Sequence, residues 1–380
     1  MKTVHRIVLS DARELAEVSD QSVNLIVTSP PYPMIEMWDA LFSRIDPEIA
    51  QALAESDTKA AFEGMHRHLD IVWKEVSRTL APGGILCVNI GDAVRTFKGN
   101  FQMFANHSRI ITCLTSLGLI QLPGILWRKP TNAPNKFMGS GMLPAGAYVT
   151  LEHEHILIFR KSEKRDFSGE DARQKRRENA YFWEERNLWF SDVWFDLIGA
   201  SQTLGYKGSR ERSGAFPLEL PYRLIHMFSL RGDLVLDPFA GTGTTLIAAM
   251  CTGRNSIHYE IDPSLHAAIL SRVASVPEFS HALACQRFDA HVAFIKDRIK
   301  TKGPLKYTNC VYSIPVVTRQ EEDLQINHVL NMHYLAKDRF GVTHDLWRPQ
   351  DPVPNLQVRM PDDSDSIPPP GGKSRQLKLF

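Results

Sequence analysis

The chain has 380 residues, and 44 Lys and Arg side chains nearly balance 43 Asp and Glu, for a formal net charge of +1 at pH 7. Apolar residues make up 43% and charged residues 23%, which excludes a collagen-like or wholly disordered chain and leaves room for one large domain or two smaller ones. The five cysteines are scattered without a Cys-x-x-Cys pair, and neither a signal-peptide core nor an apolar run of about 20 residues occurs, so we expect a reduced, cytoplasmic protein without a structural zinc site.

The first 160 residues alternate apolar segments with amphipathic ones. The apolar segments predict five strands, in chain order Ile7–Leu9, Val23–Val27, Ile85–Ile90, Leu119–Trp127 and His155–Phe159. Apolar residues three or four positions apart predict helices over 62–80 and 107–117, and we also expect a short helix between the first two strands. Nearly continuous apolar strands that alternate with helices indicate a parallel sheet covered on both faces.

This alternation stops at Arg160 and resumes at about Phe216. Residues 160–177 hold eight Lys and Arg against four Asp and Glu, and an aromatic-rich piece follows. We expect the tryptophans of that piece to be largely packed. Among the basic residues before it, we expect four side chains to be exposed: Arg173, Lys175, Arg176 and Arg177. After Phe216, helices are predicted over 221–228 and 245–251 and strands over 234–236 and 256–259. No pattern is readable after about Val276, and the proline-rich last thirty residues predict a disordered tail.

A glycine-rich turn, Asp-Pro-Phe-Ala-Gly-Thr-Gly-Thr-Thr over 237–245, lies between a strand and a helix. Glycines let a ligand approach the backbone, and the helix amino terminus offers free N–H groups. The turn lacks the Gly-Lys-Ser/Thr ending of a phosphate-binding loop, but Asp237 stands at the strand end, where it could face a cation. Glu260 lies 19 residues after Gly241, close to the about 20-residue offset at which an acid binds ribose hydroxyls. An adenosine that carries a cationic sulfonium fits this arrangement.

A second motif, Ser29-Pro30-Pro31-Tyr32, directly follows the second predicted strand. An exocyclic amine of a nucleobase is a poor nucleophile because its lone pair is delocalised into the ring. The Ser29 hydroxyl and the Pro30 carbonyl could accept its two N–H bonds, and the two prolines would hold these acceptors in place. Tyr32 could stack on a base that has been flipped out of the duplex. The pair of motifs therefore points to methylation of a base amine.

These two segments resemble the amino-methyltransferase family of DNA modification enzymes, which use S-adenosylmethionine. Further likenesses are Trp73–Gly84, Trp127–Pro130 and Phe216–Pro221, and the resemblance covers about residues 5–160 and 215–272. It implies catalytic roles for Ser29, Pro30, Pro31 and Tyr32. It also implies cofactor contacts for Asp11, Thr28, Asp237, Pro238, Phe239, Gly241, Thr242, Gly243, Thr244 and Glu260.

The catalytic segment precedes the cofactor segment, a circularly permuted order that is typical of the β group of this family. The resemblance implies an α/β fold, with a doubly wound, mostly parallel sheet of the Rossmann-like methyltransferase type. We expect a catalytic half over 1–160, an inserted target-recognition region over 161–214, a cofactor-binding half over 215–276, a C-terminal extension of unknown role over 277–355 and a disordered tail over 356–380. Basic and aromatic residues in the inserted region are a candidate DNA surface.

Serine before Pro-Pro is usual in the cytosine enzymes of this family, which favours transfer to N4 of cytosine in double-stranded DNA by base flipping. Adenine N6 enzymes more often carry Asp or Asn there, and adenine N6 stays open as an alternative. An RNA methyltransferase and a DNA-binding protein without catalysis are further alternatives. The chain has no Pro-Cys dipeptide, so the cysteine nucleophile needed for C5 methylation of cytosine is missing.

The remaining expectations concern metals and partners. Two histidines alternate with glutamates over 152–155, but the proposed chemistry needs no metal, and we predict none. The last five residues, Gln376–Phe380, resemble the peptide with which bacterial proteins bind the replication sliding clamp. We expect a monomer or homodimer in the cytoplasm of a prokaryote, associated with the nucleoid and not with a membrane, with a cognate restriction endonuclease as a candidate partner. The sequence does not reveal the DNA target.

Overall fold

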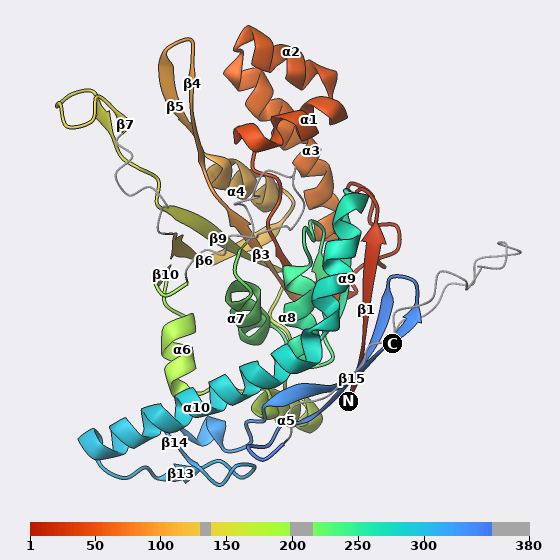
Figure 1. Cartoon of the computed structure of the whole chain (residues 1–380), viewed down its shortest axis with the longest axis vertical. Helices are drawn as coiled ribbons and strands as arrows, with labels where there is room; N and C mark the ends of the chain where they lie inside the picture. Colours follow the sequence, from red (N-terminus) through yellow and green to blue (C-terminus); the bar gives the residue numbers. More distant parts are fainter. Residues whose placement is uncertain (130–137, 198–215, 352–380) are drawn as a thin grey trace, which may run out of the picture.

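Ten strands form a single sheet in the order β10-β6-β9-β3-β2-β11-β12-β1-β16-β15 (Figure 1). The structure, a computed structural model, describes residues 1–129, 138–197 and 216–351. The strands of this sheet are β1 (Lys2–Leu9), β2 (Val23–Thr28), β3 (Leu80–Ile90), β6 (Leu119–Arg128), β9 (His153–Lys161), β10 (Val193–Trp194), β11 (Leu234–Asp237), β12 (Asn255–Glu260), β15 (Asn327–Ala336) and β16 (Arg339–Leu346). Three two-stranded ribbons are β4 (Ala93–Phe97) with β5 (Asn100–Phe104), β7 (Met138–Gly139) with β8 (Ala147–Tyr148), and β13 (Tyr307–Thr308) with β14 (Pro315–Val316).

The helices cover both faces of this sheet. They are α1 (Asp39–Ile45), α2 (Pro47–Glu55), α3 (Thr58–Thr79), α4 (Asn106–Ser116), α5 (Glu170–Glu178), α6 (Trp183–Trp189), α7 (Glu219–Phe228), α8 (Thr244–Thr252), α9 (His266–Ala274) and α10 (Val276–Lys302). Short 3-10 helices are η1 (Glu36–Trp38), η2 (Pro263–Leu265) and η3 (Arg319–Glu321). Among the described residues, no helix is both long enough and apolar enough to cross a bilayer.

The five central strands, β3, β2, β11, β12 and β1, all run parallel. Their apolar side chains feed two cores. One core packs α3 and α4 against one face, with Trp73 and Phe42 fully buried in it, and the other packs α7 and α8 against the opposite face. Every residue of α8 is buried, which its apolar sequence and its position between sheet and α10 explain. The doubly wound α/β fold expected from the sequence is confirmed.

Two local expectations were wrong, and one segment without a readable pattern proved to be ordered. Residues 10–22 form turns and no helix, because Arg78 of α3 donates to the carbonyls of Leu15 and Val18, which a helix would have satisfied internally. β9 runs antiparallel to both β3 and β6, although its apolar run suggested a parallel strand. The segment after Val276, which showed no pattern, contains the 27-residue helix α10 and the hairpin β15–β16, which extends the sheet beside β1.

The basic helix α5 lies at the amino ends of the parallel strands. Arg165 pairs with Asp233, directly before β11, and the Arg231 N–H donates to Asn179, directly after α5. Arg173, Lys175, Arg176 and Arg177 are exposed, and Trp189 and Trp194 are buried, as expected. Figure 1 shows α5 at the end from which β1 starts, with hairpin β4–β5 at the other end.

Residues 180–195 pack on two sides: Phe182 and Glu185 contact the C-terminal extension, whereas Trp189 and Trp194 are buried in the core with α7 and β6. The Phe182 ring stacks on His291 of α10 with 3.7 Å between centroids, and Arg287 of α10 is paired with Glu185. Phe182 shares a buried cluster with Val316, Leu324 and Trp347 of that extension. Phe182 and Glu185 of the expected recognition region thus contact the C-terminal extension. The recognition role of this region stays a prediction, and its residues 198–214 lie outside the described residues.

Candidate active site at the carboxyl ends of the parallel strands

The register of the parallel strands brings the two sequence motifs to one edge of the sheet. Leu236 lies opposite Ile26, so β11 and β2 end side by side. β12 and β1 follow in the same direction, with Leu9 opposite Glu260. The carboxyl edge of such a sheet is where α/β proteins bind ligands.

A direct hydrogen bond joins the two motifs. The Thr28 hydroxyl, last in β2, donates to Oδ1 of Asp237, last in β11, over 2.7 Å. The same Oδ1 accepts the Phe239 N–H at 3.0 Å, which shapes the start of the glycine turn. Asp237 is 1% exposed, and this burial raises its pKa to about 6 although both hydrogen bonds act to lower it. Burial makes this carboxyl group costly to ionise, and a buried carboxylate at the end of a strand is a strong candidate for binding a cation.

The glycine turn has the geometry that a close ligand requires. Gly241 and Gly243 adopt φ values of 55° and 78°, in the left-handed region that favours glycine. A Cβ built on Gly241 would meet no atom within 4 Å, so the turn is open at that point. On Gly243 it would come within 3.1 Å of Ile269 in α9, which explains why glycine is needed there for packing. Pro238 is buried and Phe239 half-buried, with its ring 6.2 Å from that of Trp73.

Arg272 of α9 holds the turn from outside. Its Nη1 donates to the Thr242 carbonyl at 2.9 Å, to the Thr242 hydroxyl at 2.7 Å and to the Thr244 hydroxyl at 3.1 Å. The two threonine hydroxyls, predicted to contact the cofactor, are thus engaged by this guanidinium, and both residues are buried. Nothing in the sequence pattern singled out Arg272, because its role depends on the fold of α9 against the turn.

Two further predicted carboxylates lie on this edge. Glu260 accepts the Gly241 N–H at 2.7 Å through Oε2 and the Asp262 N–H at 2.8 Å through Oε1, so it fixes the turn and is itself fixed. Each carboxylate oxygen has a second lone pair that could accept a hydroxyl. Asp11 is held by Arg13, whose guanidinium donates to Oδ2 at 2.9 and 2.6 Å; these hydrogen bonds lower the pKa of Asp11 against the opposing effect of burial.

The Ser-Pro-Pro-Tyr corner is tied to β3 and β9 by its tyrosine. The Tyr32 hydroxyl accepts from Ser29 Oγ at 3.0 Å and from Asn89 Nδ2 at 2.9 Å, and it donates to Glu154 Oε2 at 2.9 Å. Asn89 Nδ2 also reaches Glu154 Oε2 at 2.7 Å, and Lys129 Nζ reaches Glu154 Oε1 at 2.9 Å. Burial, followed by the nearby Glu154 charge, raises the pKa of Tyr32 well above its usual value, so the phenol keeps its proton.

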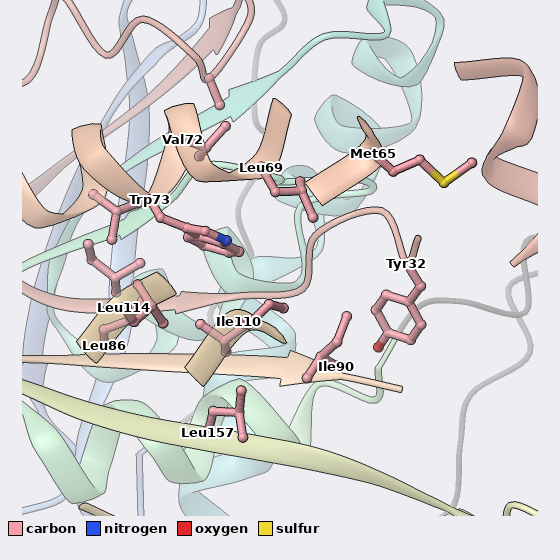
Figure 2. Close-up of a cluster of buried hydrophobic side chains, with 14 of the residues drawn as sticks. Tyr32, Met65, Leu69, Val72, Trp73, Leu86, Ile90, Ile110, Leu114 and Leu157 are labelled. Atoms are coloured by element: carbon pink, nitrogen blue, oxygen red, sulfur yellow. The ribbon is translucent and has the colours of Figure 1, made fainter. Parts of the chain in front are cut away.

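The Tyr32 ring is only 7% exposed. Figure 2 shows it just beyond the end of the strand that carries Ile90, at the margin of a cluster that includes Met65 and Ile110. Gly91 makes room for it, since a Cβ there would lie 3.0 Å from Tyr32 Cε2. The structure therefore shows Tyr32 as a packed residue whose hydroxyl is hydrogen-bonded, and its stacking on a flipped base stays a prediction. Pro30 is buried, and Ser29 and Pro31 are half-buried.

Asn106, at the start of α4, fixes the loop from the other side. Its Nδ2 donates to the carbonyls of Pro33 and Gly91, both at 3.0 Å, and its Oδ1 bonds to His66 Nε2 at 3.0 Å. This buried amide ties the residues after the corner to the residues after β3. Its role, like those of Asn89 and Glu154, arises from contacts between distant segments that composition and spacing do not reveal.

A cluster of metal-ligand type lies next to this network. Asp92, His107 and His155 offer ligand atoms within 4.8 Å of one another. The His107 ring stacks on His155 with 4.0 Å between centroids, and its Nδ1 lies 2.7 Å from Asp92 Oδ2. Burial, and then His107, lower the pKa of His155 to about 4. The prediction that the protein needs no metal therefore stays untested.

Comparison with known proteins agrees with this site. The sequence model of a family described as DNA methylase matches residues 23–271. The type II methyltransferase M.MthZI of Methanothermobacter thermautotrophicus is 51% identical over 341 residues, which cover 90% of this chain and 95% of that protein. M.MjaI of Methanocaldococcus jannaschii, also a type II methyltransferase, is 49% identical over 71% of this chain and 91% of its own length.

Among solved structures, a putative DNA modification methylase of Thermus thermophilus, TTHA0409, complexed with S-adenosyl-L-methionine, is similar, with a TM-score of 0.56 and 33% identity. The match covers 72% of this chain and 94% of that one. The family match includes both motifs and four of the five central parallel strands, and β1 lies before it. The chain therefore belongs to the N6/N4 DNA methylase family, as a DNA amino-methyltransferase of the β group.

Proposed function

We propose that the chain transfers a methyl group from S-adenosylmethionine to the N4 amine of a cytosine flipped out of double-stranded DNA. The observation that supports this proposal is the 2.7 Å bond from Thr28 to Asp237, because it joins the Ser-Pro-Pro-Tyr corner, to which we assign the amine, to the glycine turn, to which we assign the cofactor. Ser29, where adenine enzymes of the family more often have Asp or Asn, supports cytosine over adenine N6.

The residues present fit S-adenosylmethionine. The turn is open above Gly241, a buried carboxylate stands at the end of β11, and Glu260 ends the neighbouring β12. When bound, the cofactor supplies an electrophilic methyl group on a cationic sulfur. We assign Asp237 to its positively charged part, Glu260 to the ribose and Asp11 to the adenine side. We assign further cofactor contacts to Thr28, Pro238, Phe239, Gly241, Thr242, Gly243 and Thr244.

The corner would orient and activate the base. Ser29 Oγ and the Pro30 carbonyl accept the two N–H bonds of the amine, which directs the nitrogen lone pair toward the methyl group. As the N–C bond formed and the C–S bond broke, the electron pair of that bond would stay on sulfur, and the methylated amine would lose one proton to solvent water. The corner enters this step already held by Asn89, Glu154 and Asn106, so little reorganisation is needed.

We place the DNA along the carboxyl edge of the sheet. The hairpins β4–β5 and β7–β8 belong to the segments that leave β3 and β6 at that edge, and the rings of Phe101 and Tyr148 stack at 4.5 Å between them. The basic helix α5 lies at the other edge, so we do not assign it to the duplex around the target base. A restriction partner and the oligomeric state stay predictions, and the clamp-like peptide Gln376–Phe380 lies outside the described residues, as do Pro130 and the expected tail.

The methylated nucleoside tests this proposal. Purified protein is incubated with plasmid DNA and labelled S-adenosylmethionine, the DNA is digested to nucleosides, and these are separated. We expect the label in N4-methylcytosine. Label in N6-methyladenine would reverse the choice of base, label only in an RNA substrate would reverse the choice of nucleic acid, and no label in any nucleic acid would favour a binding protein without catalysis. The variant Ser29→Ala serves as the background control.

A further inference from the structure

In the hydrogen-bond network behind the corner, Glu154 decides which groups donate and which accept. We propose that Glu154 is a positioning residue that acts through Tyr32 to keep the Ser29 hydroxyl an acceptor for the target amine. The inference deepens the proposed function and rests on it, but it applies equally to a cytosine and an adenine amine.

The direction follows from counting protons. A carboxylate can only accept hydrogen bonds, so Tyr32 must use its single proton on Glu154 Oε2, 2.9 Å away. The phenol oxygen has two lone pairs left. One receives Asn89 Nδ2 at 2.9 Å, and the other receives Ser29 Oγ at 3.0 Å. Because Tyr32 has no second proton, Ser29 must be the donor in its bond to Tyr32.

This assignment leaves the Ser29 oxygen with both lone pairs and no proton of its own to offer. An isolated serine hydroxyl rotates and could point its proton at the amine, where it would draw on the nitrogen lone pair that attacks the methyl group. With the proton held toward Tyr32, Ser29 can only accept an N–H of the amine. The network therefore fixes in advance the polarity that the reaction needs.

Further contacts hold Glu154 in place. Lys129 Nζ pairs with its Oε1 at 2.9 Å, and the Glu154 side chain is 12% exposed. Asn89 uses its NH₂ group on Tyr32 and Glu154, so the orientation of the amide is fixed by the carboxylate. The Asn89 Oδ1 is buried and has no partner among the described residues, which leaves a further acceptor beside the corner.

The test is Glu154→Gln, compared with Glu152→Gln two residues earlier on the same segment. The Glu152 side chain pairs with the exposed Arg128 at 2.7 Å, and Glu152→Gln serves as the matched control. A glutamine amide can donate to the Tyr32 oxygen. The tyrosine proton would then point to Ser29, so that Ser29 accepts from Tyr32 instead of donating to it. We expect the single-turnover rate of methyl transfer to fall about 10- to 100-fold in Glu154→Gln, with the Kd for S-adenosylmethionine and for DNA within about twofold of the parent.

A double-mutant cycle with Tyr32→Phe separates positioning from general structural damage. If Glu154 acts through Tyr32, the double variant Tyr32→Phe with Glu154→Gln is no slower than the slower single variant. Multiplied losses, or a Glu154→Gln rate equal to that of the parent, would overturn the inference. Equal loss in Glu152→Gln, or a shared loss of cofactor binding, would also overturn it. A parent protein that methylates no DNA would instead defeat the proposed function, so the two failures are distinguishable.

Discussion

Replacement of Ser29 by alanine is expected to lower the rate of methyl transfer about 100- to 1,000-fold while the affinity for S-adenosylmethionine stays unchanged. The side chain contributes one of the two acceptors that we assign to the target amine. Its removal leaves the main chain of the corner in place, because Tyr32 stays bonded to Glu154 and Asn89 and the loop stays bonded to Asn106. The loss should therefore appear in kcat and not in cofactor binding.

The measurement is single-turnover transfer of labelled methyl to DNA, together with cofactor binding by calorimetry. Ser108→Ala provides the matched control, since Ser108 is exposed on α4 and its hydroxyl donates to the Ala105 carbonyl of the same turn. A Ser29→Ala protein that methylates DNA at the parent rate would show that the corner does not hold the amine.

Replacement of Asp237 by alanine is expected to abolish measurable cofactor binding, and Asp237→Asn to weaken it about 10- to 100-fold, because a hydrogen bond or contact to a charged group contributes about 1.5–3 kcal/mol. The asparagine variant keeps an oxygen for Thr28 and for the Phe239 N–H, so it separates the charge from the shape of the turn. Thr28→Val is the complementary variant, since it removes the hydroxyl and leaves the carboxylate. Cofactor affinity equal to the parent in Asp237→Asn would contradict the assignment.

The raised pKa of Asp237, about 6, adds a pH dependence to this prediction. Below pH 6 the carboxyl gains a proton and loses its attraction for a cation, so the Kd for S-adenosylmethionine should rise about tenfold from pH 7 to pH 5, and this rise should be absent in Asp237→Asn. Without cofactor the sign for stability is opposite. The folded pKa lies above the unfolded value of 3.8, so this group stabilises the fold most below pH 4, and that contribution disappears as the pH rises through about 6.

The central sheet and the contents of its carboxyl edge could be predicted from the sequence for a physical reason. Strands such as β2 and β11 are short and buried on both faces, so they are nearly all apolar, and the polar residues directly after them mark where they end. Parallel strands end at one edge, and because β2 and β11 are neighbours in the sheet, Ser29 and Asp237 lie near each other. This geometry brings the two motifs together at one edge of the sheet.

The parts that could not be predicted depend on contacts between distant segments. Glu154 read as part of a Glu-His alternation before an apolar strand, and only the antiparallel pairing of β9 with β3 brings it to Asn89 and Tyr32. Local charge made α5 a candidate DNA surface. Asn179, directly after α5, bonds to Arg231 at the amino ends of the strands, and the role of α5 in DNA binding stays a prediction. A run of charged residues indicates that a segment is exposed, but it does not indicate which edge of the sheet the segment lies near.

The most direct test of the central claim is a crystal structure with sinefungin, an analogue of S-adenosylmethionine in which an amino group replaces the reactive methyl group. We predict that this amino group lies between Asp237 and the Ser-Pro-Pro-Tyr corner, within about 6 Å of Ser29 Oγ. This limit is the sum of an attack distance of about 3–3.5 Å and the length of one hydrogen bond. An analogue bound elsewhere, or with that amino group more than about 10 Å from Ser29, would contradict a shared site for the two motifs.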